Sequence, residues 1–469
     1  MIFDVLVVGE TPAAMTAAAL LVRKGLKVAW VVPSFSGEGR EVVRPKVPDI
    51  VWDLLPQPLV REMLERLGVP YKHLEKSERR GGGIQMVSPE FRTGALDGIL
   101  EIRHELKRIF GLDETDLARI FPEIQPGGEE FLKKYWGQIF KGGGAKKTQP
   151  LSLLAPGESI APSPFSVDGL RIEPSLRRFF ELGIYSQSYV CQWVFPKSLV
   201  RHFLHNLGNL NLFAQGRLVS PEEIFKEVFQ MGGGEIFAAG VETLLEPRRE
   251  KGISLWLNKD EVVNGTVCLM AVSPEEAPEL YENLHVPHRR WHMKEELEEM
   301  TYKIANILFS IDAKGIPGGM GENLTLYTGM ATEPFTPLDL AFLTLEKTEE
   351  SGTYEGHYTV FYEGELGEEE LEGWTSEQIR RLDRLFPFMT TFLTVETVFV
   401  SGEHTLSSGD YFYYGTRKRR LGAVGIKEGA FGKNSYYIGR RQLDYMGLEG
   451  EIITAFKAVQ WVLDRLTKL

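Results

Sequence analysis

The first stretch of the chain constrains its fold more than any other part. Residues 3–8 form an apolar run that is followed by Gly9, an alanine-rich stretch over residues 12–24 and a second apolar run over residues 27–32. A short buried strand, a tight turn, a helix and a second strand make up a βαβ unit, the usual opening of a nucleotide-binding domain. The sequence therefore predicts an α/β fold that begins with two parallel strands.

The turn after the first strand matches the glycine pattern of such domains only in part. A diphosphate binds at the N-terminus of the first helix because unpaired N–H groups and the positive end of the helix dipole point at it. The usual turn carries the pattern G-x-G-x-x-G/A. Gly9 and Ala14 occupy its first and third positions, whereas Thr11 replaces the second glycine. Because Pro12 suits the first helical position, Thr11 is predicted to be the N-cap, where its hydroxyl competes with a phosphate for N–H groups.

The second strand lacks the acidic residue that dinucleotide folds use to hold the ribose. It ends at Val32 and Pro33, and a valine side chain accepts no hydrogen bond from a ribose hydroxyl. Two interpretations follow. The opening is either a weakened dinucleotide site or a parallel strand pair that binds no nucleotide at this point.

Composition narrows the class of protein. The chain has 469 residues, of which 43% are hydrophobic and 25% charged, so we expect a globular protein with two domains. Its formal net charge of −12 argues against a nucleic-acid groove, and no apolar run is long enough to cross a bilayer. Cys191 and Cys268 form no disulfide framework and indicate a reducing compartment. We expect a cytoplasmic protein without a leader sequence.

Beyond the opening, helical and strand-rich stretches follow each other. The apolar spacing of helices is present in residues 97–110, 113–120, 129–139, 174–182 and 196–206. Capping boxes at Ser220 and Thr375 predict two more helices. Short strands are predicted at residues 235–238, 241–246, 252–257 and 266–271. An antiparallel set is predicted at residues 303–311, 323–327, 338–345 and 357–362.

The C-terminal segment has features in common with the opening. Residues 435–438 are predicted to form a strand that ends at Gly439, and Gly447 and Gly450 lead into a helix over residues 451–466. A helix that starts with glycines after a strand is a site for an anion. In the simpler interpretation, the terminal helix only covers the sheet and its glycines allow close packing.

In this order, the elements resemble the FAD-dependent amine oxidase superfamily, and in particular its phytoene desaturase and carotenoid isomerase branch. The resemblance extends over essentially the whole chain. Residues 220–274 carry it most clearly: a capped helix is followed by Gly-Gly-Glu-Ile at residues 233–236, and residues 271–274 resemble the end of a strand in the family.

The resemblance implies an α/β protein with a Rossmann-like FAD-binding domain and an inserted α+β substrate domain of helices and an antiparallel sheet. Residues 1–90, 215–290 and 425–469 would form the discontinuous FAD-binding domain, and residues 91–214 and 291–424 the substrate domain. The positions that match the family's cofactor-binding motifs are Gly9, Thr11, Ala14, Gly37, Gly39, Arg40, Val241, Gly439, Gly447, Leu448 and Gly450.

Two hypotheses about function follow from the resemblance. The first is an FAD-dependent oxidoreductase, similar to desaturases and isomerases, that acts on a hydrophobic substrate such as an isoprenoid. The second is a flavin-free binding or escort protein on the same scaffold, similar to Rab escort proteins and GDP-dissociation inhibitors. Thr11, Val32 and Arg440 depart from the family's pattern and favour the second. Both hypotheses predict a hydrophobic small molecule or lipid as partner, with contact to a membrane surface, and neither assigns a catalytic residue.

Two histidine patterns are candidates for a metal site. His285, His288 and His292 have a spacing that suits one helical face, but Pro287 interrupts the run and favours a solvated loop. His202 and His205, three residues apart, are predicted to lie on a helix surface. The sequence therefore predicts no metal site.

An aromatic segment has two interpretations, a functional and a purely structural one, and an acidic run has a structural one. Tyr185, Tyr189, Trp193 and Phe195 would line an apolar tunnel or, in the simpler interpretation, pack in the core. The glutamates between residues 363 and 372 are predicted to be solvated.

Overall fold

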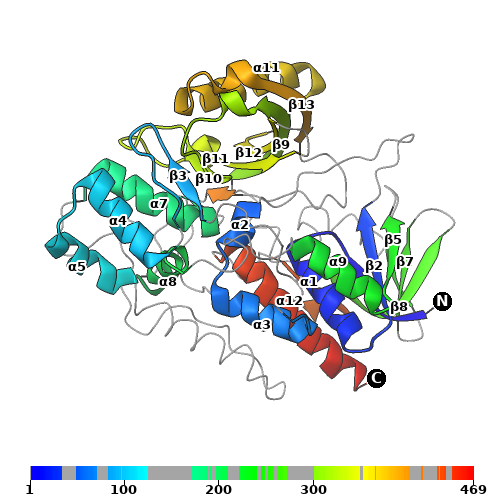
Figure 1. Ribbon diagram of the computed structural model, residues 1–469. Helices are drawn as coiled ribbons and strands as arrows, with labels where there is room; N and C mark the ends of the chain where they lie inside the picture. The colour runs from blue at the N-terminus through cyan, green and yellow to red at the C-terminus, as the bar shows by residue number, and fades with distance from the viewer. Residues whose placement is uncertain are drawn as a thin grey trace.

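The computed structural model contains two β-sheets with a layer of helices between them (Figure 1). The structure describes residues 2–33, 49–70, 83–96, 98–124, 172–188, 190–191, 197–209, 221–239, 244–248, 252–257, 261–271, 300–348, 352–364, 366–400, 413–415, 430–431, 434–439 and 446–468. Its helices are α1 (Pro12–Arg23), α2 (Asp49–Asp53), α3 (Gln57–Leu67), α4 (Ile99–Phe110), α5 (Glu114–Ile124), α7 (Pro174–Ser188), α8 (Lys197–Leu207), α9 (Pro221–Met231), α11 (Glu368–Leu385) and α12 (Gly447–Leu466).

The first sheet has a parallel centre. Its strands are β1 (Ile2–Val8), β2 (Val28–Pro33), β5 (Glu235–Ala239), β6 (Leu244–Arg248), β7 (Gly252–Trp256), β8 (Val262–Met270), β15 (Ala430–Phe431) and β16 (Ser435–Tyr437). They run in the order β15-β16-β8-β1-β2-β5, and from β16 to β5 every neighbouring pair is parallel. Strands β6 and β7 form an antiparallel pair that joins β8. This topology confirms the predicted α/β, Rossmann-like class.

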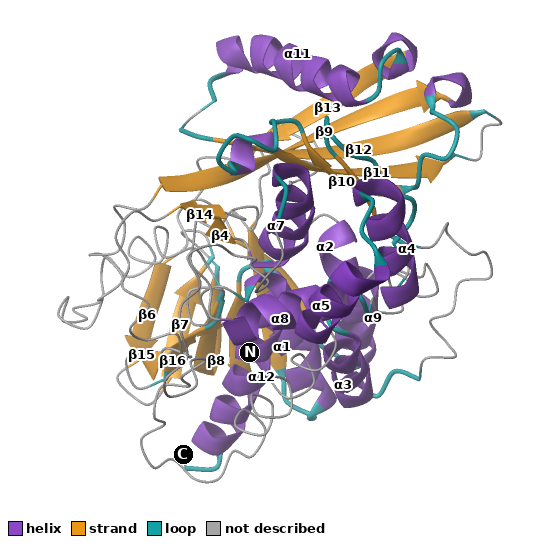
Figure 2. Cartoon of the chain, turned by 90° about the vertical axis from the view of Figure 1, so that its left-hand side faces the viewer, coloured by secondary structure: helices purple, strands orange, loops and turns teal. Residues whose placement is uncertain are grey.

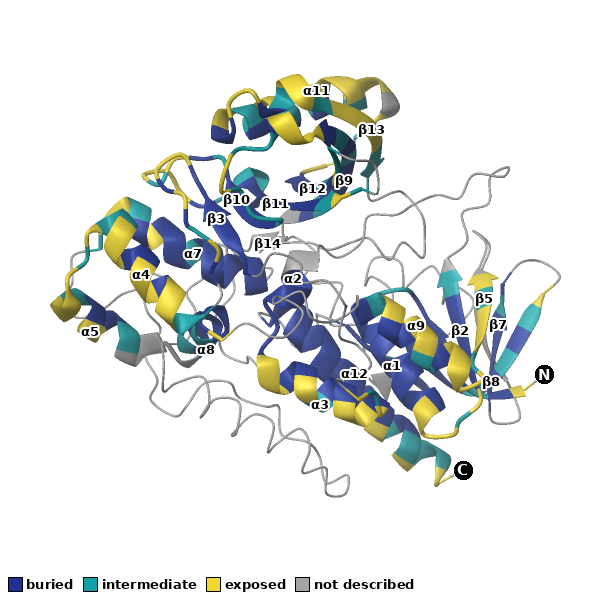
Figure 3. Cartoon of the chain, in the orientation of Figure 1, coloured by how far each residue is buried: buried dark blue, intermediate teal, exposed yellow. Residues whose placement is uncertain are grey.

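The two faces of the first sheet are covered differently, and β1 shows how the sequence produces this. Successive side chains of a strand point to opposite faces. Val5 and Val7 lie in the core shared with α1, α9 and α12, whereas Leu6 and Val8 pack with Leu255 of β7. Because both faces are covered, β1 is apolar at almost every position. Figure 3 shows α1 almost entirely buried within the helix layer.

The second sheet is mainly antiparallel. Its strands are β3 (Gln85–Val87), β4 (Val190–Cys191), β9 (Met300–Asp312), β10 (Asn323–Tyr327), β11 (Leu340–Lys347), β12 (Thr353–Tyr362), β13 (Leu393–Val400) and β14 (Tyr413–Gly415). The order is β3-β10-β11-β12-β9-β14-β4, and β13 also pairs with β9. The pairs β3–β10 and β14–β4 are parallel and the others are antiparallel. Three 3-10 turns adjoin these strands: η4 (Ala313–Gly315), η5 (Pro337–Asp339) and η6 (Met389–Phe392).

Helices cover both faces of the second sheet, and α7 and α11 lie on opposite sides of it (Figure 2). Leu340 and Phe342 of β11 pack on the inner side, in the same core as α7, and Leu343 packs on the outer side with Leu382 of α11. The inner core is continuous with that of the first sheet. The second sheet is therefore built against the helix layer of the first.

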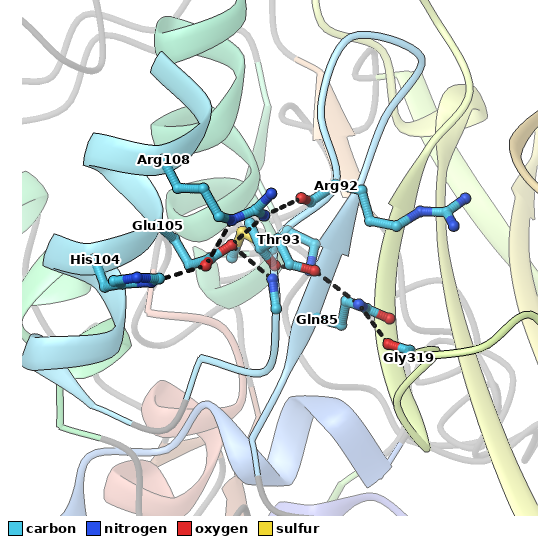
Figure 4. A network of polar contacts seen from close by, with 9 residues as sticks. Gln85, Arg92, Thr93, His104, Glu105, Arg108 and Gly319 are labelled. Atoms are coloured by element: carbon cyan, nitrogen blue, oxygen red, sulfur yellow. Dashed lines mark hydrogen bonds and ion pairs between the residues drawn. The ribbon is translucent and has the colours of Figure 1, made fainter. Parts of the chain in front are cut away.

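A buried carboxylate attaches α4 to the second sheet (Figure 4). Glu105 receives two hydrogen bonds from Arg108, at 3.0 and 2.6 Å, and one from the backbone N–H of Gly94 at 2.7 Å. Arg108 also donates to the carbonyl of Arg92. These bonds, those from Arg108 first, hold the pKa of the Glu105 carboxyl below its usual range.

The network continues into the second sheet. Gln85 of β3 donates to the carbonyl of Thr93 at 2.7 Å and to that of Gly319 at 3.3 Å. Arg92 donates to the carbonyl of Leu385 at the end of α11 and stacks on the ring of Phe386. Elements that are far apart in the sequence are thus joined around α4.

Several predicted element boundaries are wrong. Strands β8 and β12 begin at Val262 and Thr353, four residues before the predicted starts at residues 266 and 357. Helix α7 extends through Ser188, six residues beyond its predicted end at residue 182. Helix α11 begins at Glu368, and Thr375 lies buried inside it and not at its start. The acidic side chains of residues 369, 370 and 372 are exposed as predicted, but they belong to this helix. The predicted helix over residues 129–139 lies outside the described residues.

Candidate functional site

Three strand ends meet at the carboxyl edge of the first sheet. Gly9 follows β1, Ala271 follows β8, and Gly439 lies just beyond β16. The Ala271 N–H donates to the carbonyl of Val8 at 2.8 Å, so the ladder extends to the tip of β1. The chain leaves β1 toward β2 on one side, and β8 lies on the other. Ligands of parallel α/β sheets bind at the crevice where the strand order reverses in this way.

Gly9 has a conformation and a position that other residues tolerate poorly. Its φ of +111° lies in the range that favours glycine. A Cβ at this position would overlap the carbonyl oxygen of Ala271. The indole of Trp30 donates to the Gly9 carbonyl at 2.8 Å and holds the turn from the core side. The turn is therefore rigid and close to the neighbouring strand.

Helix α1 begins with the predicted cap. The Ala14 N–H donates to the Thr11 hydroxyl at 3.2 Å, and Pro12 occupies the first helical position. Pro12 has no N–H group and the cap uses that of Ala14, so the N–H of Ala13 is left to a ligand. This helix end therefore offers fewer N–H groups to an anion than a glycine-rich turn does.

The N-termini of α12 and α1 lie at the same end of a packed pair of helices. Helices α1 and α12 pack side by side and both run away from the second sheet (Figure 1). Gly447 has a φ of +49°, and a Cβ here would overlap the carbonyl oxygen of Gln187 at the end of α7. Leu448 and Gly450 are buried in the same turn. The end of α7 thus lies against the N-terminus of α12, which is the positive end of this helix.

A buried contact between a histidine and a glutamate occupies the first turn of α12. The Nε2 atom of His202 lies 2.7 Å from Oε2 of Glu449, and their side chains are 0% and 4% exposed. The surface position predicted for His202 is wrong. The signal was present in the sequence, because His202 and Asn206 lie three residues after Leu199 and Phe203, on the apolar stripe of α8.

Most of the other predicted site residues lie outside the part of the chain that the structure describes. Gly37, Gly39, Arg40, Val241 and Arg440 lie outside the described residues. So do Tyr189, Trp193, Phe195 and the three histidines at 285, 288 and 292. Val32, at the end of β2, is partly exposed.

Tyr185 packs in an aromatic core. Its ring centroid lies 4.5 Å from that of Phe335, which in turn stacks on Tyr327. Tyr185 is 3% exposed. Of the two interpretations of the aromatic segment, the described part of it fits core packing.

Reactive and metal-binding groups do not gather in the described part of the chain. Cys268 is fully buried in β8, and burial raises the pKa of its thiol well above the usual range, so the reactive thiolate is disfavoured. The described residues contain no cluster of metal ligands. Among the described helices, none combines the length and the apolar composition needed to cross a membrane.

Comparison with solved structures shows which fold this is. A structure of putrescine oxidase bound to putrescine is 14% identical, with a TM-score of 0.55 and 99% of each chain covered. The chain has the fold of putrescine oxidase. An oxidoreductase from Methanosarcina mazei is 11% identical, with a TM-score of 0.51, and the match covers 98% of this chain and 100% of that one. No protein-family model matches the sequence, and no curated protein matches it. The fold implied by the resemblance to amine oxidases is confirmed, and the phytoene desaturase branch stays a prediction.

Proposed function

We propose that the chain is an FAD-dependent oxidoreductase. The observation that carries this proposal is that α1 begins at the carboxyl edge of a parallel sheet, and that α12 packs on α1 with its N-terminus toward the same side of the molecule. Both ends offer N–H groups and positive partial charge to an anionic dinucleotide. The shared fold with putrescine oxidase and with the Methanosarcina oxidoreductase supports the same assignment.

The described residues fit the group in two places. The tight turn at Gly9 and the N–H of Ala13 would hold the diphosphate. The first turn of α12, from Gly447 to Gly450, would face the flavin ring. Val32 supplies no acceptor for the ribose, so the binding energy would rest mainly on the two helix ends. FAD would supply hydride transfer at flavin N5, while the protein orients the substrate and excludes water.

For the substrate we propose a hydrophobic molecule, in the manner of desaturases and isomerases that act on isoprenoids. The proposal follows the resemblance to that branch. The inner face of the second sheet, with Tyr302, Phe342 and Phe361, is apolar and belongs to the core that reaches the first sheet. The chain would be a cytoplasmic protein that meets such substrates at a membrane surface. The division into an FAD-binding and a substrate domain, with the boundaries given above, belongs to the same proposal.

An absorbance spectrum of the purified protein tests the cofactor. We expect absorption near about 450 nm and FAD that is released on denaturation, because flavins keep this band when protein-bound. Gly9→Ala protein should lose the band, since a side chain at this turn overlaps Ala271. Colourless protein that also refuses added FAD would leave the flavin-free binding protein as the better hypothesis.

Anaerobic mixing tests the substrate class. FAD-loaded protein is combined with an isoprenoid polyene in one sample and with a diamine in another. Bleaching of the flavin band by the polyene alone supports the proposal. Bleaching by the diamine alone would replace the hydrophobic substrate with an amine.

A further inference from the structure

Glu449 lies at the position from which a glutamate caps its own helix. Gly447 and Leu448 are the first two residues of α12, so Glu449 is the third, and a glutamate there can accept a hydrogen bond from the N-cap backbone N–H. The N-cap is Met446, whose side chain makes no capping bond. Within the described chain, the only hydrogen bond of the Glu449 side chain runs to His202. The carboxylate is thus held away from the cap.

The contact between His202 and Glu449 is not explained by stability alone. Both side chains are almost fully buried, and Oε1 of Glu449 has no hydrogen-bond partner among the described residues. A buried polar pair is often no more stable than an apolar pair of similar volume, and a buried carboxyl oxygen without a hydrogen-bond partner adds a further cost. Gln187, on the neighbouring turn of α7, also has a buried side-chain amide oxygen, Oε1, without a partner in the described chain. Polar groups therefore remain in a place where packing favours apolar ones.

The position of the Glu449 carboxylate affects the charge and the free N–H groups at the N-terminus of α12. A carboxylate that caps α12 would occupy the N–H group and offset the positive end of the helix. These are the features that would receive the negatively charged side of a flavin ring. His202 belongs to α8, so a helix that is distant in the sequence sets the position of the Glu449 carboxylate at the end of α12.

We propose that His202 is a positioning residue that holds Glu449 away from the N-cap of α12 and so keeps this helix end open for the flavin. The inference rests on the proposed function. Without the imidazole, the Glu449 carboxylate turns back to cap its own helix, and the flavin meets a blocked and less positive helix end.

Two variants of His202 separate this role from a merely structural one. His202→Leu removes the hydrogen bond, whereas His202→Gln places an amide N–H close to the position of Nε2. In FAD-free protein, we expect hydrogen exchange at the Met446 amide to slow in His202→Leu and to stay as in the wild type in His202→Gln. FAD affinity should fall about fivefold in His202→Leu, the factor that one capping interaction gives, and be kept in His202→Gln.

A double variant provides the decisive comparison. Glu449→Met has the length of glutamate without its carboxylate, so His202→Leu combined with Glu449→Met should recover both the fast exchange at Met446 and the wild-type FAD affinity. Equal loss of affinity in His202→Leu and in the double variant would overturn the proposal. So would unchanged exchange at Met446 in His202→Leu.

The outcome stays readable if a variant or the proposed function fails. If His202→Leu does not fold, Glu449→Met alone must bind FAD at least as tightly as the wild type, and weaker binding would contradict the restraint. If the wild type takes up no FAD, the proposed function fails, while exchange at Met446 still decides whether His202 restrains Glu449.

Discussion

Thr11 decides how many N–H groups the end of α1 can offer to a phosphate. Its hydroxyl accepts the N–H of Ala14, which a glycine at this position would leave to a ligand. Capping stabilises the helix in the absence of any ligand. The same substitution that weakens the predicted diphosphate site therefore strengthens α1.

Thr11→Ala should separate these two effects. We expect the free energy of unfolding to fall by about 1 kcal/mol, because the cap is lost, and the affinity for FAD to rise, because the Ala14 N–H becomes available. Urea unfolding and FAD titration measure the two changes. Thr11→Ser keeps the hydroxyl and should change neither, and a Thr11→Ala protein that binds FAD more weakly would contradict the competition.

Gly9 and Gly25 form a matched pair for testing the turn. Both have positive φ, but a Cβ on Gly9 overlaps Ala271 whereas a Cβ on Gly25 meets no atom within 4 Å. Gly25→Ala should cost about 1 kcal/mol, the strain of the left-handed backbone. Gly9→Ala should cost about 3 kcal/mol or more, because steric overlap adds to the strain. Equal losses in urea unfolding would show that the contact with Ala271 relaxes easily.

At the scale of elements, α4 depends on a charge. The Glu105 carboxylate is hydrogen-bonded by Arg108 and by the Gly94 backbone, and joins the helix to the hairpin that carries β3. Its pKa in the folded protein is lowered, so its contribution to stability is fully present above the unfolded-state pKa of about 4.3. That contribution is lost as the pH falls below this value, through the folded-state pKa.

Glu105→Gln should therefore destabilise the protein in a pH-dependent way. At pH 7 we expect a loss of about 1.5–3 kcal/mol, the usual contribution of hydrogen bonds to a charged group. The difference from the wild type should shrink as the pH is lowered from about 5 toward 4 and below. Glu101→Gln, an exposed position on the same helix, is the control. A difference that stays constant over this range would show that the charge of Glu105 is not what holds α4.

At the scale of the whole molecule, the two sheets share one core. Val7 of β1, Phe342 of β11 and Phe179 of α7 belong to the same cluster of buried side chains. Neither sheet can lose its inner face without exposing the apolar surface of the other. The helix layer is therefore a common wall and not a linker.

The shared core predicts coupled unfolding. Urea transitions followed by far-UV circular dichroism and by tryptophan fluorescence should coincide, since Trp30 and Trp52 lie in this core. Phe342→Ala should move both transitions together, by about 3–5 kcal/mol of stability. Two separated transitions, of which only one responds to this change, would mean that the sheets unfold independently.

Local patterns predicted most elements, and long-range contacts decided the exceptions. The cap at Thr11 is a bond between residues three positions apart, and local apolar runs mark the strands of the first sheet, so the sequence revealed both. The start of α11 was missed because Thr375 matches a capping box, although its side chain is buried on the helix face that packs on the second sheet. The capping pattern describes local bonding and carries no information about burial.

The sequence by itself determined the order of the elements, the parallel opening and the altered diphosphate turn, since periodicity, glycines and caps act over short distances. Only the tertiary structure decided that His202 and Glu449, 247 positions apart, form a buried pair at the end of α12. The reason is physical: a contact between two side chains depends on the distance between them, and that distance is set by the packing of α7 against both α8 and α12. Whether a charged residue is solvated or restrained is therefore a property of the fold.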